Sequence, residues 1–242
     1  MRKTLKTITA VALIATTSGL IIAETTIKNT KTNTDAVKTD SISAPLFKTD
    51  LSNAIFPDKP WGIKDGILSP TGHGDIWTKK RYRDFILELD FKCAKNSNSG
   101  VFLRCYDIKR WLNTCIEVQI LQPDIPNKKH ICGAVFDCLA PTKNAIKPVG
   151  EWNHYKITVK DNHIKTELNG ENVLDMDLDK WTEAGRNPDG SRNKFKYAYK
   201  DMSREGHIGL QYHGQPIWFR NVNIRELKKH PAPTQTKSGA SE

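Results

Sequence analysis

The strongest constraint in this sequence is an alternation of apolar and polar side chains with a period of two residues. In residues 85–93 (FILELDFKC) every odd-numbered position is apolar, while Glu88, Asp90 and Lys92 occupy even-numbered positions. Successive side chains of a β-strand point to opposite faces, so this pattern is typical of a strand with one buried face. Comparable runs occur at residues 101–105, 116–120, 155–159, 163–168, 207–213 and 217–224.

Turn signals separate these runs and favour antiparallel pairing between them. The pair Asn169-Gly170 lies directly after residues 163–168, and Asn-Gly is the preferred sequence of a two-residue β-hairpin turn. No stretch shows a long apolar period of 3.6 residues. We therefore predict an all-β protein, a jelly-roll sandwich of two antiparallel sheets, interrupted by one long charged loop at residues 180–204.

The first residues resemble a secretory signal peptide. Arg2 and Lys3 precede a mostly apolar run at residues 7–23, and polar sequence begins at Glu24. An uncleaved membrane anchor is the alternative, but Thr and Ser dilute the run, and no Cys follows it to carry a lipid. We expect cleavage after Ala23, no stable membrane span afterwards, and a periplasmic or extracellular location.

The rest of the chain divides by composition. Residues 24–44 are rich in Thr, Lys, Asn and Asp and poor in large apolar side chains, which predicts a disordered linker. Residues 228–242 carry Pro and small polar residues, which predicts a disordered tail. The folded domain is therefore expected at residues 45–227.

Charge and cysteine content exclude two classes of site. The formal net charge is +10, but the basic residues alternate with acidic ones instead of gathering on one face, which argues against nucleic-acid binding. The five cysteines lack the CxxC spacing and neighbouring His of a zinc site. Cys93 continues an apolar strand face and is expected in the core. Up to two disulfides remain, with Cys105–Cys115 and Cys132–Cys138 as candidate pairs.

Strand parity also places a set of polar side chains on one surface. In residues 116–120 the apolar positions are even-numbered, so Glu117 and Gln119 share the opposite face. The same argument sets Phe102 and Arg104 outward on one strand, and Gln211 and His213 outward on another. An ordinary solvated face would explain these residues too. The mixture of charged, amide and aromatic groups favours a sugar-binding surface, because sugars present both hydroxyls and apolar ring faces.

Nine short motifs in order resemble the 3-keto-disaccharide hydrolase domain family, and together they span about residues 47–227. They are GDIWTK at 74–79, YRDF at 82–85, NSGVFLR at 98–104, EVQIL at 117–121, GA at 133–134, KPVGEWN at 147–153, LNG at 168–170, GLQYHG at 209–214 and FRN at 219–221. The chain departs from the family pattern after EVQIL, where Gln122 and Pro123 stand, and beside GA, which Cys132 and Phe136 flank. The resemblance implies a concanavalin A-like jelly roll.

The resemblance also implies a reaction. A ketone at sugar C3 acidifies the proton on C2, so a base can remove it, the C1 substituent leaves by β-elimination, and water adds to complete hydrolysis. Glu117 or His213 would be the base, and Arg104, Gln119 and Gln211 would hold the enolate oxygen and hydroxyls. No cofactor is required, although a divalent cation could supply the same support. Further residues of the matched motifs are expected to contact the oligosaccharide or glycoside: Phe102, Asn98, Asp75, Lys147 and Arg220.

Other functions fit parts of the pattern. A conventional glycosidase needs two carboxyl groups flanking the bond, and only Glu117 is evident here. A non-catalytic carbohydrate-binding module is the main alternative, with Trp77, Trp111, Trp152 and Trp218 as candidate stacking residues, although Trp in a sandwich is more often packed in the core. A cell-surface adhesion domain would explain the linker but not the polar face.

Overall fold

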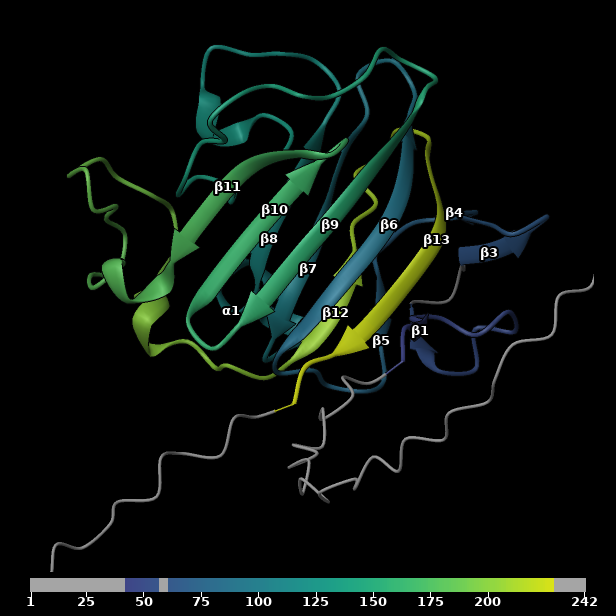
Figure 1. The fold of residues 1–242 in the computed structure, drawn as a ribbon, viewed down its shortest axis with the longest axis horizontal. Coiled ribbons are helices and arrows are strands. Elements are labelled where there is room, and N and C mark those ends of the chain that lie inside the picture. The colour runs from purple at the N-terminus through teal and green to yellow at the C-terminus, as the bar shows by residue number, and fades with distance from the viewer. Residues whose placement is uncertain (1–41, 57–60, 229–242) are drawn as a thin grey trace, which may run out of the picture. The chain divides into compact units, whose positions relative to one another are not determined.

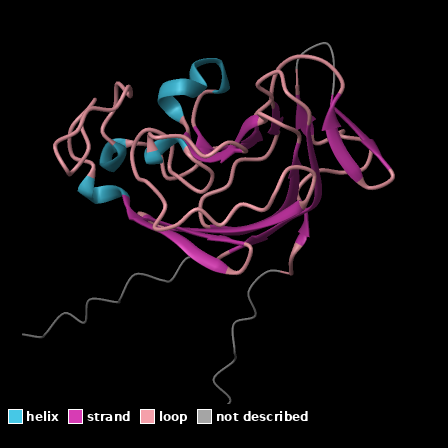
Figure 2. Ribbon diagram, turned by 90° about the horizontal axis from the view of Figure 1, so that it is seen from above, coloured by secondary structure: helices cyan, strands magenta, loops and turns pink. Residues whose placement is uncertain are grey.

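The computed structural model describes residues 42–56 and 61–228, all within one compact unit at residues 39–242. It confirms the predicted all-β jelly-roll sandwich of two antiparallel sheets. In Figure 1 the strands of the larger sheet lie in front of those of the smaller sheet, and Figure 2 shows the two layers from above. The predicted signal peptide, most of the predicted linker and almost all of the predicted tail lie outside the described residues. No helix in the described part of the chain is long and apolar enough to span a membrane.

The larger sheet has eight strands. In order across the sheet they are β11 (Glu171–Asp177), β10 (His163–Leu168), β9 (Trp152–Lys160), β6 (Phe85–Cys93), β13 (Ile217–Glu226), β4 (Ile67–Pro70) and β3 (Trp61–Lys64), with β1 (Ala44–Pro45) also paired to β13.

The smaller sheet has five strands. In order they are β2 (Ala54–Ile55), β5 (Ile76–Thr78), β12 (His207–Leu210), β7 (Asn98–Cys105) and β8 (Ile116–Leu121). The described helices are short: α1 (Trp111–Thr114) and the 3-10 turns η1 (Ile108–Arg110), η2 (Lys128–His130), η3 (Leu178–Lys180) and η4 (Tyr199–Asp201).

The core lies between the sheets and follows the alternation in the sequence. The odd-numbered residues of β6, from Phe85 to Cys93, are fully buried, and the even-numbered residues are partly exposed. Each such side chain contributes roughly 1.5–3 kcal/mol through its burial. The predicted hairpin joins β10 to β11, with Asn169 at φ 55° and Gly170 at φ 82°, the left-handed backbone that a two-residue turn with this sequence requires.

Both faces of the smaller sheet are buried, which the alternation alone did not predict. All residues of β8 except Leu121 are buried, and so are all residues of β7 except Asn98. The inward face meets the core, and loops cover part of the outward face. One of these loops, residues 106–114, is closed by the disulfide between Cys105 and Cys115.

The cysteines otherwise remain unpaired. Cys93, Cys132 and Cys138 are free and buried, so the structure confirms the core position of Cys93 and one of the two candidate disulfides. The other candidate pair does not form. Cys132 instead lies 3.1 Å from the hydroxyl of Tyr155.

The second covering loop is the predicted charged segment at residues 180–204. It is anchored by apolar side chains, because Trp181, Phe195 and Tyr199 are all buried. The indole Nε1 of Trp181 donates to Oδ1 of Asn187 at 3.0 Å, and Nδ2 of Asn187 donates to the carbonyl of Asp137 at 3.1 Å. These contacts fix the loop against the segment that borders β8.

The structure corrects the predicted direction of Arg104. A β-bulge places two residues of β7, Leu103 and Arg104, opposite Ile208 of β12, and Arg104 has φ 49°. A bulge shifts the alternation by one residue. As a result Cys105 faces outward, and the Arg104 side chain turns inward to the end of the larger sheet.

The guanidinium of Arg104 joins the two sheets. It donates to the carbonyls of Arg83 and Asp161, both at 2.6 Å, and to Oδ1 of Asp84 at 2.8 Å. The Arg104 side chain is fully buried and that of Asp84 is 6% exposed. Arg104 is therefore a structural residue, and the prediction that it binds the sugar is wrong.

Asp84→Asn should destabilise the protein by about 3 kcal/mol or more, because it leaves the buried Arg104 cation without its counter-charge. Asp175→Asn is the matched control, since Asp175 pairs with Lys165 at an exposed site and its loss should change stability by less than about 1 kcal/mol. Urea denaturation measures both. Equal stability of the two variants would contradict a role for the Arg104–Asp84 pair in holding the sheets together.

Candidate active site

A small cavity of about 280 Å³ opens on the outward face of the smaller sheet. Its volume is close to the lower end of small-ligand pockets, about 300 Å³. Six of the predicted site residues and their neighbours line it: Gly74, Asp75, Asn98, Trp111, Glu117, Gln119, Phe136, Lys194, Gln211, Tyr212 and His213. Strands β7 and β8 form its floor, and the loops after β8 and before β12 form its walls.

Glu117 lies across Gly100 on the floor of this cavity. The two residues belong to adjacent strands, where Gly100 pairs with Gln119 and Phe102 pairs with Glu117. A Cβ atom at position 100 would lie 2.3 Å from Oε1 of Glu117, which is far inside van der Waals contact. The space that the glutamate occupies therefore exists only because residue 100 has no side chain.

The carboxyl of Glu117 is largely buried and has no hydrogen-bond partner in the described part of the protein. The residue is 9% exposed, and no hydrogen bond to its carboxyl is found among the described residues. Burial raises the pKa of Glu117 to about 8, although the nearby Lys194 lowers it and Asp75 adds to the increase. Glu117 is thus mainly protonated at neutral pH.

Asp75 supplies a second carboxyl with a different environment. Burial raises its pKa to about 6, while the backbone N–H of Tyr212, which donates to Oδ1 at 3.0 Å, and the neighbouring His213 both lower it. At neutral pH Asp75 is therefore mainly ionised and Glu117 mainly protonated. His213 lies at the exposed rim of the same cavity.

Three carboxamides complete the polar lining. Nε2 of Gln119 donates to Oδ1 of Asn98 at 2.9 Å, which leaves Oε1 of Gln119 buried without a partner in the described structure. Gln211 is held beside Gly100, because its N–H donates to the Gly100 carbonyl at 2.9 Å and its own carbonyl accepts from the Ser99 hydroxyl at 2.7 Å. These groups are suited to sugar hydroxyls, which both donate and accept.

Sequence analysis missed one charged residue of the cavity, Lys194. It lies in the long loop, where strand alternation gives no information about side-chain direction. Its backbone N–H donates to Oδ2 of Asp137 at 2.9 Å, and its ammonium lies 4.2 Å from the centre of the Phe136 ring. The loop therefore brings a cation close to the Glu117 carboxyl.

The aromatic residues beside the cavity form a stack. Phe102 faces outward as predicted, but its ring lies between Trp77, at 4.9 Å, and Trp111, at 5.0 Å. Phe102 is only 1% exposed, so the prediction that it contacts substrate is wrong. Trp111, at the outer end of the stack, lines the cavity and is the sugar-stacking candidate that remains.

Two other predicted contact residues lie outside the cavity. Arg220 belongs to β13 of the larger sheet, where it donates to Asp90 at 3.1 Å and covers the ring of Trp152 at 4.1 Å. Lys147 lies in the loop before β9 and donates to the Trp152 carbonyl at 3.1 Å. Both were expected from motif position alone, and their placement contradicts a role at this site.

The described residues contain no group of three or more His, Cys, Asp or Glu side chains arranged to hold a metal ion.

Comparison with protein families gives a match along most of the chain. The model of the 3-keto-alpha-glucoside-1,2-lyase-like domain matches residues 43–225. A curated relative from Bacteroides thetaiotaomicron, named 3-keto-disaccharide hydrolase, is 27% identical over 203 residues, which cover 69% of this chain and 70% of the relative.

Solved structures of related proteins also match most of the chain. A protein from Parabacteroides distasonis, provisionally named a glycosyl hydrolase, is 37% identical with a TM-score of 0.73 and covers 77% of this chain and 100% of its own. A second protein with the same name and from the same organism is 26% identical with a TM-score of 0.58, and covers 76% of this chain and 84% of its own.

Glu117→Gln should make the stability of the protein less dependent on pH. The folded protein holds the Glu117 proton more tightly than the unfolded chain does, because burial raises the pKa to about 8. Wild-type protein therefore loses stability as the pH rises from the ordinary carboxyl range through that value, and the variant lacks this loss. Between about pH 5 and about pH 9, the stability of the variant relative to wild type should rise by about 2–4 kcal/mol.

Chemical denaturation at both pH values measures this difference. Glu151→Gln is the control, because Glu151 is exposed and lies outside the cavity. If the Gln variant at position 117 followed wild type at both pH values, as the control should, the carboxyl would not be desolvated.

Proposed function

Since the chain belongs to the 3-keto-alpha-glucoside-1,2-lyase-like family, we propose that it is a glycosidase-type enzyme that cleaves 3-keto-disaccharides or 3-keto-glycosides. The family description names an elimination across C1 and C2, and the curated relative is named for hydrolysis of a 3-keto-disaccharide. Elimination followed by addition of water unites the two descriptions, because its net result is hydrolysis.

The observation that carries this proposal is the pair of carboxyls with different protonation states in one cavity. Elimination needs a base for the C2 proton and an acid for the leaving oxygen. Glu117, with a pKa of about 8, is the proton donor, and Asp75, with a pKa of about 6, is an anion at neutral pH. Groups whose environments separate their pKa values in this way divide the acid and base roles between them.

We assign the base to His213, supported by Asp75. The imidazole of His213 removes the proton from C2, and the electron pair moves onto the C3 ketone oxygen to give an enolate. The Asp75 carboxylate, whose pKa the neighbouring His213 lowers, stabilises the imidazolium that forms by charge attraction. Of the two residues that the sequence offered as the base, this choice favours His213 over Glu117. A protonated carboxyl is too weak a base to remove the C2 proton.

The second step expels the aglycone. The enolate collapses to form the C1–C2 double bond, the C1–O bond breaks, and Glu117 gives its proton to the departing oxygen. Water then adds across the double bond, with its oxygen at C1 and a proton returned to C2, so that the products are a 3-keto sugar and a free alcohol. The now ionised Glu117 is suited to activate that water.

The remaining polar groups stabilise the enolate. Lys194 lines the cavity, and its positive charge lowers the pKa of Glu117. The carboxamides of Gln119 and Gln211 offer neutral donors and acceptors for hydroxyls. Fixed donors directed at an oxygen that becomes negative contribute more than mobile water molecules would, because they need no reorganisation during the reaction. We assign Lys194 the role that sequence analysis gave to Arg104.

A non-catalytic binding module is the alternative, and the Glu117 environment argues against it. Binding a neutral sugar requires hydrogen-bonding groups and ring faces, which Gln119, Gln211 and Trp111 already provide. A largely buried carboxyl without a hydrogen-bond partner in the protein destabilises the folded state when it is ionised and adds nothing to such binding. It is explained if the residue must carry a proton at neutral pH.

We also propose that the enzyme is exported and acts on its glycoside outside the cytoplasm. This rests on the signal-like residues 1–23 in the sequence. Amino-terminal sequencing of the protein purified from its native host should give a chain that starts after Ala23, and an intact amino terminus would contradict export by this route.

The purified protein should cleave a 3-keto-disaccharide and leave the unoxidised parent disaccharide intact, because only the ketone acidifies the C2 proton. Glu117→Gln and His213→Ala should each lower kcat by roughly 10²–10⁴-fold. Asp75→Asn should have a smaller effect, since Asp75 acts through His213. Product formation is followed by chromatography, with and without added divalent cation and chelator, because a cation on the ketone could replace the support from Lys194.

Glu151→Gln again serves as the control and should keep wild-type activity. Circular dichroism establishes that each variant is folded. Cleavage of both sugars at equal rates would remove the elimination mechanism, and full activity of His213→Ala with loss in Asp75→Asn would transfer the base to Asp75. Binding of the 3-keto sugar without any turnover would favour the binding module.

A further inference from the structure

A larger pocket lies beside α1, the helix that carries Trp111 of the catalytic cavity. This pocket has a volume of about 650 Å³, and a second opening of about 530 Å³ shares four of its residues, Arg110, Asn113, Lys196 and Tyr197. Trp111 lines both that second opening and the catalytic cavity. We call the two openings together the aromatic groove. Trp111 is the lining residue that the groove and the catalytic cavity have in common.

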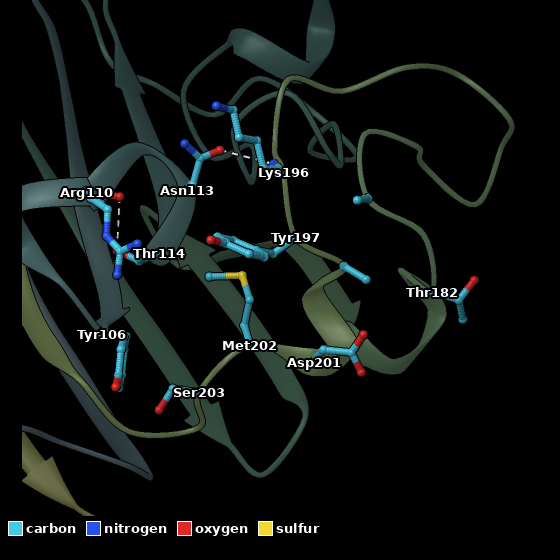
Figure 3. Close-up of a pocket in the computed structure, with 12 residues that line it drawn as sticks. Tyr106, Arg110, Asn113, Thr114, Thr182, Lys196, Tyr197, Asp201, Met202 and Ser203 are labelled. Atoms are coloured by element: carbon cyan, nitrogen blue, oxygen red, sulfur yellow. Dashed lines mark hydrogen bonds between the residues drawn. The ribbon is translucent and has the colours of Figure 1, made fainter.

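Two segments that are far apart in the sequence form the walls of the groove. One is the loop at residues 106–114, which the Cys105–Cys115 disulfide closes. The other is the end of the long loop at residues 196–203, and the backbone N–H of Lys196 donates to Oδ1 of Asn113 at 3.1 Å to join them. Figure 3 shows this bond and the side chains that line the pocket. The disulfide therefore fixes one wall of the groove, and the Lys196–Asn113 hydrogen bond ties the other wall to it.

Most of the large hydrophobic side chains that are exposed in the described part of the chain lie in the groove. The described part of the chain has five large hydrophobic residues that are exposed, and Tyr106, Leu112 and Tyr197 all line the groove. The Tyr106 ring is covered by the guanidinium of Arg81 at 5.2 Å. Tyr197 is 50% exposed, and its ring has no stacking or cationic partner among the described residues. In Figure 3 it lies near the middle of the lining residues, next to Met202.

The chemistry of the lining matches a sugar ring. The pocket that Tyr197 lines also holds side chains that can bond hydroxyls: Arg110, Asn113, Asp201 and Ser203. A pyranose presents an apolar face of C–H groups and a rim of hydroxyls, so a bare aromatic ring with polar neighbours is complementary to it. A purely apolar aglycone would make no hydrogen bonds to these polar groups.

We propose that the aromatic groove binds the aglycone of the 3-keto-glycoside, and that this aglycone is itself a sugar that stacks on Tyr197. The proposal rests on the proposed function, because it places the 3-keto ring in the catalytic cavity and the leaving group over Trp111. The protein would then be selective for disaccharides or longer sugars over glycosides with a small aglycone.

Tyr197→Ala tests this assignment with three substrates of increasing aglycone size: a methyl 3-keto-glucoside, a phenyl 3-keto-glucoside and a 3-keto-disaccharide. For the disaccharide, kcat/KM should fall by about 3- to 10-fold, the effect of losing one ring contact. The methyl glucoside has no group to reach Tyr197, so its kcat/KM should not change. Val149→Ala is the matched control, since Val149 is 51% exposed and lies outside the groove.

An equal effect on the methyl glucoside and the disaccharide, or no effect on either, would overturn the groove as an aglycone site. A loss confined to the phenyl glucoside would overturn the assignment of a sugar. If wild-type protein cleaves none of the three, the proposed function has failed, and calorimetric binding of the 3-keto-disaccharide to the Glu117→Gln protein still tests the groove. Tyr197→Ala in that background should weaken this binding by a similar factor, and unchanged binding would refute the groove.

Discussion

The burial of one carboxyl group without a hydrogen-bond partner is the constraint on which the rest of this site depends. Glu117 can lie flat on the smaller sheet only because Gly100, on the adjacent strand, leaves the space free. Burial of the carboxyl raises its pKa to about 8, which keeps a proton available at neutral pH. In the proposed mechanism, the division of acid and base roles between Glu117 and the Asp75–His213 pair follows from that single placement.

Two loops convert this sheet surface into an open pocket. The disulfide-closed loop at residues 106–114 supplies Trp111, and the long loop at residues 180–204 supplies Lys194. The long loop is fixed by its own buried anchors, Trp181 and Phe195, so it forms a wall of defined structure. The same two loops also form the walls of the aromatic groove, so the proposed aglycone site and the proposed catalytic cation Lys194 depend on the same pair of loops.

Strand alternation predicted much of the fold and part of the site, and its failures have specific causes. It placed Glu117, Gln119 and Gln211 on one outward face, because the alternation is regular in β8 and continues from β12 into Gln211, the residue after its last one. It failed for Arg104, since a bulge in β7 reverses the parity there. It could not show that aromatic rings cover Phe102. Lys194 was missed because side-chain direction in a loop depends on tertiary contacts, and sequence pattern carries no signal for them.

A direct titration of the Glu117 carboxyl tests the central claim most closely. The carboxyl carbon can be followed by carbon-13 NMR in protein labelled at glutamate, and its signal assigned by its absence in the Glu117→Gln variant. The account predicts a titration midpoint near the raised pKa, about 8. A midpoint near the ordinary value of 4.5 would show that the group is ionised at neutral pH and would contradict its role as the proton donor.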